Sequence, residues 1–269
     1  MAKKNKPEDG LKILKNIKKR DKKIITGWGP TSAILVTLGV YFGSQILAGY
    51  LVIQYLFMLG NTSKEINNIL DDSVIVRFCL MVLIGFISIG LLWAFLRKRK
   101  ISWPEIGLKK PTSNNLFYSL PAYAIYFVIL VMAFALIKSF VPGIDTGQKQ
   151  QIGFDNAVGP IALSFVFISI VIIPAVVEEI TVRGFLYGGL KNKLPIVASA
   201  LLTSGIFAVA HLQLGSGENP LWIAAVDTFI LSMVLIWLRE KTGNIWAGVV
   251  VHLMKNSLAF ISLFIIKAT

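Results

Sequence analysis

Long apolar runs constrain the fold of this chain more than any other sequence feature. Seven runs follow one another from residue 31 onward, each about the length that a helix needs to cross a bilayer. They cover residues 31–59, 73–96, 115–141, 159–190, 196–213, 220–238 and 244–266. The sequence therefore predicts an all-α, polytopic transmembrane helical bundle of about seven spans, in which the last four helices form a core that carries the site.

Composition supports this fold class and excludes others. Hydrophobic residues make up 55% of the chain and charged residues 15%, whereas a soluble domain has about 45–50% and about 25%. The single cysteine, Cys79, excludes an intramolecular disulfide and makes redox chemistry an unexpected function. We expect no cleavable signal peptide, because the first apolar run follows a polar segment and is too long for a signal sequence.

The basic residues predict an orientation in the membrane. A net charge of +13 would also suit a nucleic-acid-binding protein, but 21 of the 27 Lys and Arg residues lie in four short segments that flank apolar runs. These segments are residues 1–27, 97–110, 183–193 and 239–241. Basic loops on one side of the spans are typical of the cytoplasmic face. We expect a multi-pass protein of the cell membrane with a cytoplasmic N-terminus and with lipids, not nucleic acid, as partners.

The chain divides into three expected parts. Residues 1–27 form a basic cytoplasmic tail or an interfacial helix on an anionic leaflet, and both readings stay open. Residues 28–157 supply accessory transmembrane helices, and residues 158–269 form the catalytic transmembrane core. We expect polar loops at 61–72 and 142–156.

Two smaller features belong to the same prediction. Arg77 is expected to snorkel or to pair with Asp71 or Asp72 near the outer end of its span. Residues 215–217, Gly-Ser-Gly, are expected to form an outer turn.

The fourth span contains two adjacent carboxylates and an arginine. A charge in hydrocarbon costs at least ~2.5–3.5 kcal/mol, so ionisable residues there are rare and usually functional. Glu179 and Arg183 are spaced i, i+4 and are predicted to pair. Glu178 lies about 100° round the helix, without that partner, and is predicted to be the chemical group. The alternative is that all three form one structural ion network.

The two histidines of the chain both lie in apolar spans. Phe207 precedes His211 by four residues, and Asn256 follows His252 by four, so each pair shares a helix face. Counted from the cytoplasmic ends of their helices, Glu178, His211 and His252 lie about 20, 24 and 14 Å deep. One buried histidine is more often a satisfied core residue than a catalyst. Because three separate helices place Glu178, His211 and His252 at similar depths, the pattern favours a functional site.

This residue set supports hydrolysis of an amide by water. A carboxylate with a histidine can deprotonate a water molecule, and a second histidine with an asparagine can stabilise an oxyanion. Glu178, His211 and His252 also match the two-histidine, one-glutamate ligand set of zinc hydrolases. The residues themselves leave both mechanisms open.

Three motifs resemble those of the CAAX-type intramembrane endopeptidase family, also called the CPBP or Abi family. Each is weak alone, but their order on three predicted spans is specific, and the similarity covers about residues 160–260. The motifs are Glu178-Glu-Ile-Thr-Val-Arg183, Phe207-Ala-Val-Ala-His211 and His252-Leu-Met-Lys-Asn256.

The resemblance implies a glutamate-type intramembrane protease that needs no cofactor. It implies that Glu178 and His211 activate the water and that His252 and Asn256 stabilise the oxyanion. The implied supporting residues are Glu179, Arg183 and Phe207. Members have often been called metalloproteases, so zinc held by Glu178, His211 and His252 is the alternative.

The resemblance also implies a substrate class. Eukaryotic members remove the last three residues of prenylated proteins, and bacterial members are associated with bacteriocin self-immunity and peptide maturation. The short loops of this chain favour a bacterial type, so we expect a peptide or membrane protein as substrate.

Two other function classes compete with the protease. One is a non-catalytic membrane scaffold or immunity protein with the same fold, which the complete motifs disfavour. The other is a proton-coupled transporter that uses the buried Glu and His as a relay. Such transporters often contain inverted repeats, and the sequence shows none.

Lys255 is an unusual charge inside the last motif. Lys255 and Asp227 lie at the same expected depth, about 18 Å from the cytoplasmic ends of neighbouring antiparallel helices. Opposite charges in hydrocarbon are expected to pair. We predict an ion pair that fixes the rotation of the last helix and so helps to aim His252. Alternatively, Lys255 faces a watery cavity near the site and Asp227 caps a separate polar pocket.

Overall fold

The structure, a computed structural model, describes residues 27–141, 143, 145, 148, 152–213 and 219–266. All regular elements within these ranges are helical, which confirms the predicted all-α bundle. The predicted basic tail, apart from residue 27, and the predicted outer turn at 215–217 lie outside the described residues.

Six helices in the described part of the chain are long and apolar enough to cross a membrane. They correspond to six of the seven predicted spans. They are α2 (Pro30–Met58), α4 (Val74–Arg99), α5 (Ser113–Phe140), the composite helix Pro160–Lys191, α10 (Trp222–Thr242) and the composite helix Trp246–Ile265. The predicted span at 196–213 is instead the 14-residue helix α9 (Ile196–Val209), which is shorter than the prediction.

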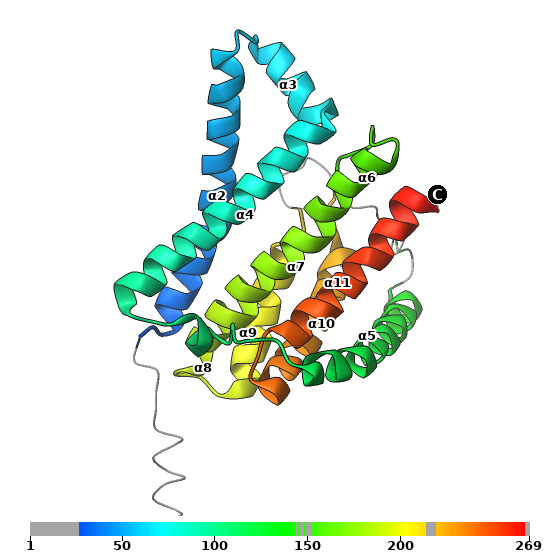
Figure 1. The fold of residues 1–269 in the computed structure, drawn as a ribbon. Helices are drawn as coiled ribbons and strands as arrows, with labels where there is room; N and C mark the ends of the chain where they lie inside the picture. The colour runs from blue at the N-terminus through cyan, green and yellow to red at the C-terminus, as the bar shows by residue number, and fades with distance from the viewer. Residues whose placement is uncertain are drawn as a thin grey trace, which may run out of the picture.

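The fourth span runs through the middle of the bundle, between α4 and α11 (Trp246–Phe260) (Figure 1). As predicted, it continues past Arg183, and it ends at Lys191. Its parts are α6 (Pro160–Phe167), the π-helical Ile168–Ile172, α7 (Ile173–Glu178), the π-helical Glu179–Leu186 and α8 (Tyr187–Lys191). The last span ends in a third π-helical segment, Ile261–Ile265. π-Helical segments inside helices often occur at functional sites.

The predicted loop at 61–72 is wrong, because α3 (Ser63–Asp72) occupies most of it. Thr62 and Glu65 form a reciprocal capping box: Oγ1 of Thr62 accepts from the Glu65 amide at 3.4 Å, and the Glu65 carboxylate accepts from the Thr62 amide at 2.7 Å. Arg77 pairs with Asp71 at 3.5 Å, as predicted.

A linker between α4 and α5 fixes the start of α11. It contains the short 3₁₀ helix Trp103–Ile106, after which three backbone carbonyls accept hydrogen bonds from the segment that leads into α11. These bonds are Ile245 N to Gly107 O at 3.1 Å, Trp246 Nε1 to Lys109 O at 2.7 Å and Asn244 Nδ2 to Lys110 O at 3.0 Å. The linker therefore holds the helix that carries His252.

Trp28 attaches the start of α2 to the fourth span. Its indole N–H donates to the carbonyl of Phe185 at 2.9 Å, and its ring stacks on the Phe185 ring with 5.5 Å between centroids. Gly189 leaves room for the indole, since a Cβ there would overlap the Trp28 ring. Because Phe185 lies in the π-helical segment, this contact supports the backbone just after the paired Glu179 and Arg183.

We predict that Trp28→Phe lowers the free energy of unfolding by about 1–3 kcal/mol, because it leaves a buried carbonyl without its donor while an aromatic ring remains. Thermal unfolding of the purified protein in detergent measures the change. The control is Trp93→Phe, since Trp93 is exposed, and its effect should stay within about 0.5 kcal/mol. Equal effects of the two variants would contradict the role given to Trp28.

Candidate active site

The site contains a fully buried ion pair. Arg183 Nη1 lies 2.8 Å from Glu179 Oε1, and both side chains are 0% exposed. The guanidinium also lies over the Phe207 ring, 4.3 Å from its centroid, where the electron-rich face attracts a cation. The predicted Glu179–Arg183 pair is confirmed, and Phe207 supports it from α9.

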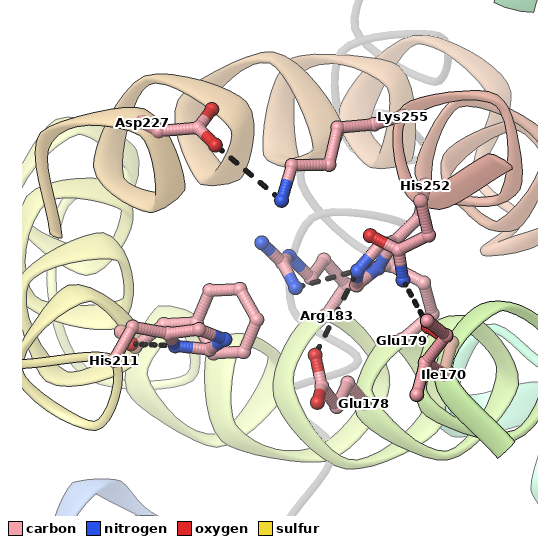
Figure 2. Close-up of polar contacts among 10 residues, drawn as sticks. Ile170, Glu178, Glu179, Arg183, His211, Asp227, His252 and Lys255 are labelled. Atoms are coloured by element: carbon pink, nitrogen blue, oxygen red, sulfur yellow. Dashed lines mark hydrogen bonds and ion pairs between the residues drawn. The ribbon is translucent and has the colours of Figure 1, made fainter. Parts of the chain in front are cut away.

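His252 lies between the two glutamates (Figure 2). Its Nδ1 is 3.3 Å from Glu179 Oε1, and its Nε2 is 3.8 Å from Glu178 Oε2. The Glu178 side chain is 27% exposed, whereas that of Glu179 is fully buried. The structure thus separates the adjacent carboxylates as the sequence predicted, and it gives Glu178 a histidine as its neighbour.

Gly248 allows α11 to come this close to the fourth span. A Cβ at Gly248 would lie 2.6 Å from Glu179 Oε2, so any side chain there would displace the buried carboxylate. Gly248 precedes His252 by one helical turn. Sequence reasoning missed it, because nothing in the local pattern distinguishes it from the other glycines of the apolar spans.

His211 lies just beyond the end of α9, not within a helix as predicted. Helix α9 ends at Val209, and the His211 amide bonds the carbonyl of Ala208 in a turn. The His211 ring nevertheless contacts the Phe207 ring, with 4.6 Å between centroids. Its Nδ1 is 2.8 Å from the Phe207 carbonyl. A carbonyl only accepts hydrogen bonds, so Nδ1 carries the proton and Nε2 of the neutral ring is an acceptor.

His211 lies within electrostatic range of Glu178, Lys255 and His252. The turn after α9 therefore places the second histidine in the same electrostatic environment as the first histidine and the open glutamate. Figure 2 shows His211 across the site from His252.

Asn256 donates from Nδ2 to the carbonyl of Ile170 at 3.2 Å. That carbonyl lacks its usual helical donor, because Pro174, four residues later, has no N–H. Asn256 thus connects α11 to the irregular part of the fourth span. Sequence reasoning predicted Asn256 near His252 and missed this partner.

The predicted Asp227–Lys255 ion pair is confirmed. Lys255 Nζ lies 3.3 Å from Asp227 Oδ2, and the two side chains are 26% and 19% exposed. The hydroxyl of Tyr126, on α5, donates to Asp227 Oδ1. Sequence reasoning missed Tyr126, since a tyrosine in an apolar span carries no signal of its partner on another helix.

The described residues hold no closely gathered set of metal ligands. In the described ranges no group of three or more His, Cys, Asp or Glu side chains gathers closely enough to hold a metal ion. Glu178, His211 and His252, the alternative zinc set, have suitable ligand atoms but do not form such a group in this structure.

We predict that Arg183→Met destabilises the protein by about 3–5 kcal/mol, because it leaves the buried Glu179 carboxylate without its partner. Thermal unfolding in detergent checks this. Lys191→Met is the matched control: Lys191 pairs with Glu240 at the surface, where an ion pair contributes about 0–1 kcal/mol. The double variant Glu179→Gln/Arg183→Met should be milder than Arg183→Met. Undiminished stability of Arg183→Met would count against the pair.

Comparison with known proteins supports the resemblance seen in the motifs. The family model described as Type II CAAX prenyl endopeptidase Rce1-like matches residues 160–258. No curated protein and no solved structure matches the chain. The matched segment contains the site residues described above other than Tyr126. Six helices in the described part of the whole chain could cross a membrane. The chain is thus a multi-pass membrane protein whose residues 160–258 match the Rce1-like family of type II CAAX prenyl endopeptidases.

Proposed function

We propose that this protein is an intramembrane endopeptidase that hydrolyses a peptide bond with a water molecule activated by Glu178 and His211. One observation carries the proposal. Glu178 is a partly open carboxylate that lies 3.8 Å from a buried histidine, beside a separate and fully buried ion pair. A structural ion network would not require one of its carboxylates to stay open.

Glu178 is the proposed general base. It takes a proton from the water as the water oxygen bonds to the carbonyl carbon of the substrate, and the carbonyl electron pair moves onto the oxygen. His211 orients the water. Its Nδ1–H donates to the Phe207 carbonyl, so its Nε2 can accept a hydrogen bond from the water. Glu178 then returns the proton to the leaving nitrogen as the carbon–nitrogen bond breaks. The products are a carboxylic acid and an amine.

His252 is the proposed donor to the oxyanion. With a proton on both ring nitrogens, it donates to Glu179 from Nδ1 and presents Nε2–H beside Glu178. The charges of Glu178, Glu179, Arg183 and His252 then sum to zero, which suits a site surrounded by hydrocarbon. Asn256 has a second amide proton besides the one it gives to Ile170, and we assign it to the same oxyanion.

The membrane sets the substrate class. Because the site lies among apolar helices, the substrate is a peptide or membrane protein that reaches it from the bilayer. Processing of peptides of the bacteriocin type, or self-immunity, is the proposed biological setting. The distribution of basic residues supports a cytoplasmic N-terminus in a protein of the cell membrane. The description of the matched family makes a prenylated peptide one probe to try first.

Replacing the base or either histidine should abolish cleavage. We predict that Glu178→Ala, His211→Ala and His252→Ala each lose activity while the protein still accumulates in the membrane. The assay is mass spectrometry of prenylated and unmodified hydrophobic peptides incubated with protein in liposomes. Leu120→Ala on the outer face of α5, where the side chain is exposed, is the control and should cleave like the wild type. Cleavage by Glu178→Ala at the wild-type rate would refute the mechanism.

Activity should not depend on a metal. The reason is chemical: a glutamate and a histidine suffice to activate the water, and histidine and asparagine suffice to stabilise the oxyanion. We predict equal cleavage rates before and after exhaustive chelation, with substoichiometric zinc in the purified active protein. Stoichiometric zinc, with activity lost to chelator and restored by zinc, would overturn this prediction in favour of Glu178, His211 and His252 as ligands.

A further inference from the structure

We propose that Lys255 is a further catalytic residue, whose ammonium group donates a hydrogen bond to the oxyanion of the tetrahedral intermediate. The inference rests on the proposed endopeptidase function and adds a residue to it. Neither the motifs nor the family match assigns Lys255 a role.

The position of the ammonium group is the first argument. Lys255 extends from α11 into the space between the helices, on the side where His211 and Glu178 lie (Figure 2). Lys255 lies within electrostatic range of His211, as does Glu178. Lys255 also follows His252 by three residues, so both side chains project from adjoining parts of the same helix face.

The exposed fraction of the charged side chains is the second argument. The side chains of Glu178, Lys255 and Asp227 are 27%, 26% and 19% exposed, while those of Glu179 and Arg183 are 0% exposed. The side chains of Asp227 and Lys255 are therefore exposed to an extent similar to that of Glu178, the proposed base.

The free hydrogen-bonding capacity of Lys255 is the third argument. An ammonium group has three N–H donors, and that of Lys255 forms an ion pair with Asp227 Oδ2 at 3.3 Å. Tyr126 holds the other oxygen of Asp227, so the carboxylate is fixed from both sides and the ammonium is held in place. By contrast, Asn256 already gives one amide proton to Ile170. Within the described residues, Lys255 therefore has more unused N–H donors near the site than Asn256.

The proposed step needs no additional reactant. As the water oxygen bonds to the carbonyl carbon and Glu178 takes the proton, the carbonyl oxygen becomes negatively charged. The Lys255 ammonium and His252 Nε2–H each donate a hydrogen bond to this oxygen. When the carbon–nitrogen bond breaks, the electron pair returns to re-form the carbonyl, and Lys255 keeps its protons throughout.

The test compares stability with activity in three variants. Lys255→Met, Lys255→Arg and the double variant Asp227→Leu/Lys255→Met are assayed in liposomes with whichever peptide the wild type cleaves. Removing one oxyanion donor usually lowers kcat by about 10²–10³-fold, so we expect a loss of about 10²-fold for Lys255→Met with KM little changed. Lys255→Arg should recover part of this loss, because it keeps a charged donor.

The double variant separates catalysis from packing. Removing both charges should restore most of the thermal stability lost in Lys255→Met, because no unpaired carboxylate remains. If Lys255 is catalytic, kcat stays low in the double variant. If the pair only fixes the rotation of α11, kcat recovers together with stability, and the proposal is wrong. Lys191→Met, at the surface pair with Glu240, is the control and should keep wild-type kcat.

Cleavage assays of the wild type and of Glu178→Gln separate a failure of the endopeptidase proposal from a failure of the role proposed for Lys255. Cleavage by the wild type and none by Glu178→Gln uphold the endopeptidase, and Lys255→Met then decides the role of Lys255 alone. Wild-type kcat in Lys255→Met would refute that role and leave the endopeptidase intact. No cleavage by the wild type of any peptide offered would contradict the endopeptidase function, and the role of Lys255 with it.

Discussion

The structure of the site depends on one contact, the buried ion pair between Glu179 and Arg183. Each charge alone would be costly in hydrocarbon, so neither residue can be placed there without the other. The i, i+4 spacing on a helix provides the contact locally. The rest of the site is assembled on it: Phe207 covers the guanidinium, His252 contacts the carboxylate, and Gly248 lets α11 approach closely enough for that contact.

Because Arg183 pairs with Glu179, a second carboxylate, that of Glu178, stays available for chemistry. Glu178 is one residue away on the same helix, so it points to a different side and stays partly open. Helix α11 presents His252 to both glutamates, and the turn after α9 brings His211 to the other side. The linker after α4 and the indole of Trp28 hold these elements from outside the site. Two segments outside the matched residues therefore contribute to the geometry of a site whose proposed catalytic residues all lie in the matched segment.

Helical spacing and depth along the helices predicted the two ion pairs but not the contacts of His252. The Glu179–Arg183 pair followed from helical spacing, and the Asp227–Lys255 pair followed from equal depth on adjacent helices. Both depend on the high cost of a lone charge in hydrocarbon, which leaves few alternatives. The contact of His252 with two glutamates was not predictable, because it depends on how α11 is rotated against the fourth span.

Backbone irregularity was the other limit of the sequence. The π-helical segments have the same apolar composition as regular helix, so periodicity could not reveal them. The early end of α9 at Val209 was hidden for the same reason, and it moved His211 from a helix to a turn. Helix α3 was missed although Thr62 and Glu65 have the spacing of a capping box, because the segment was judged by its polarity alone.

The most direct test of the account is a single-turnover cleavage in water enriched in ¹⁸O, followed by mass spectrometry of the newly formed carboxyl group. If Glu178 acts as a base on water, the product of the first turnover carries one ¹⁸O atom from the solvent. If Glu178 instead attacked the substrate directly, water would hydrolyse the resulting anhydride at the Glu178 carbonyl. The first product would then carry ¹⁶O, and the label would appear on the protein. The account predicts labelled product, and unlabelled product would contradict it.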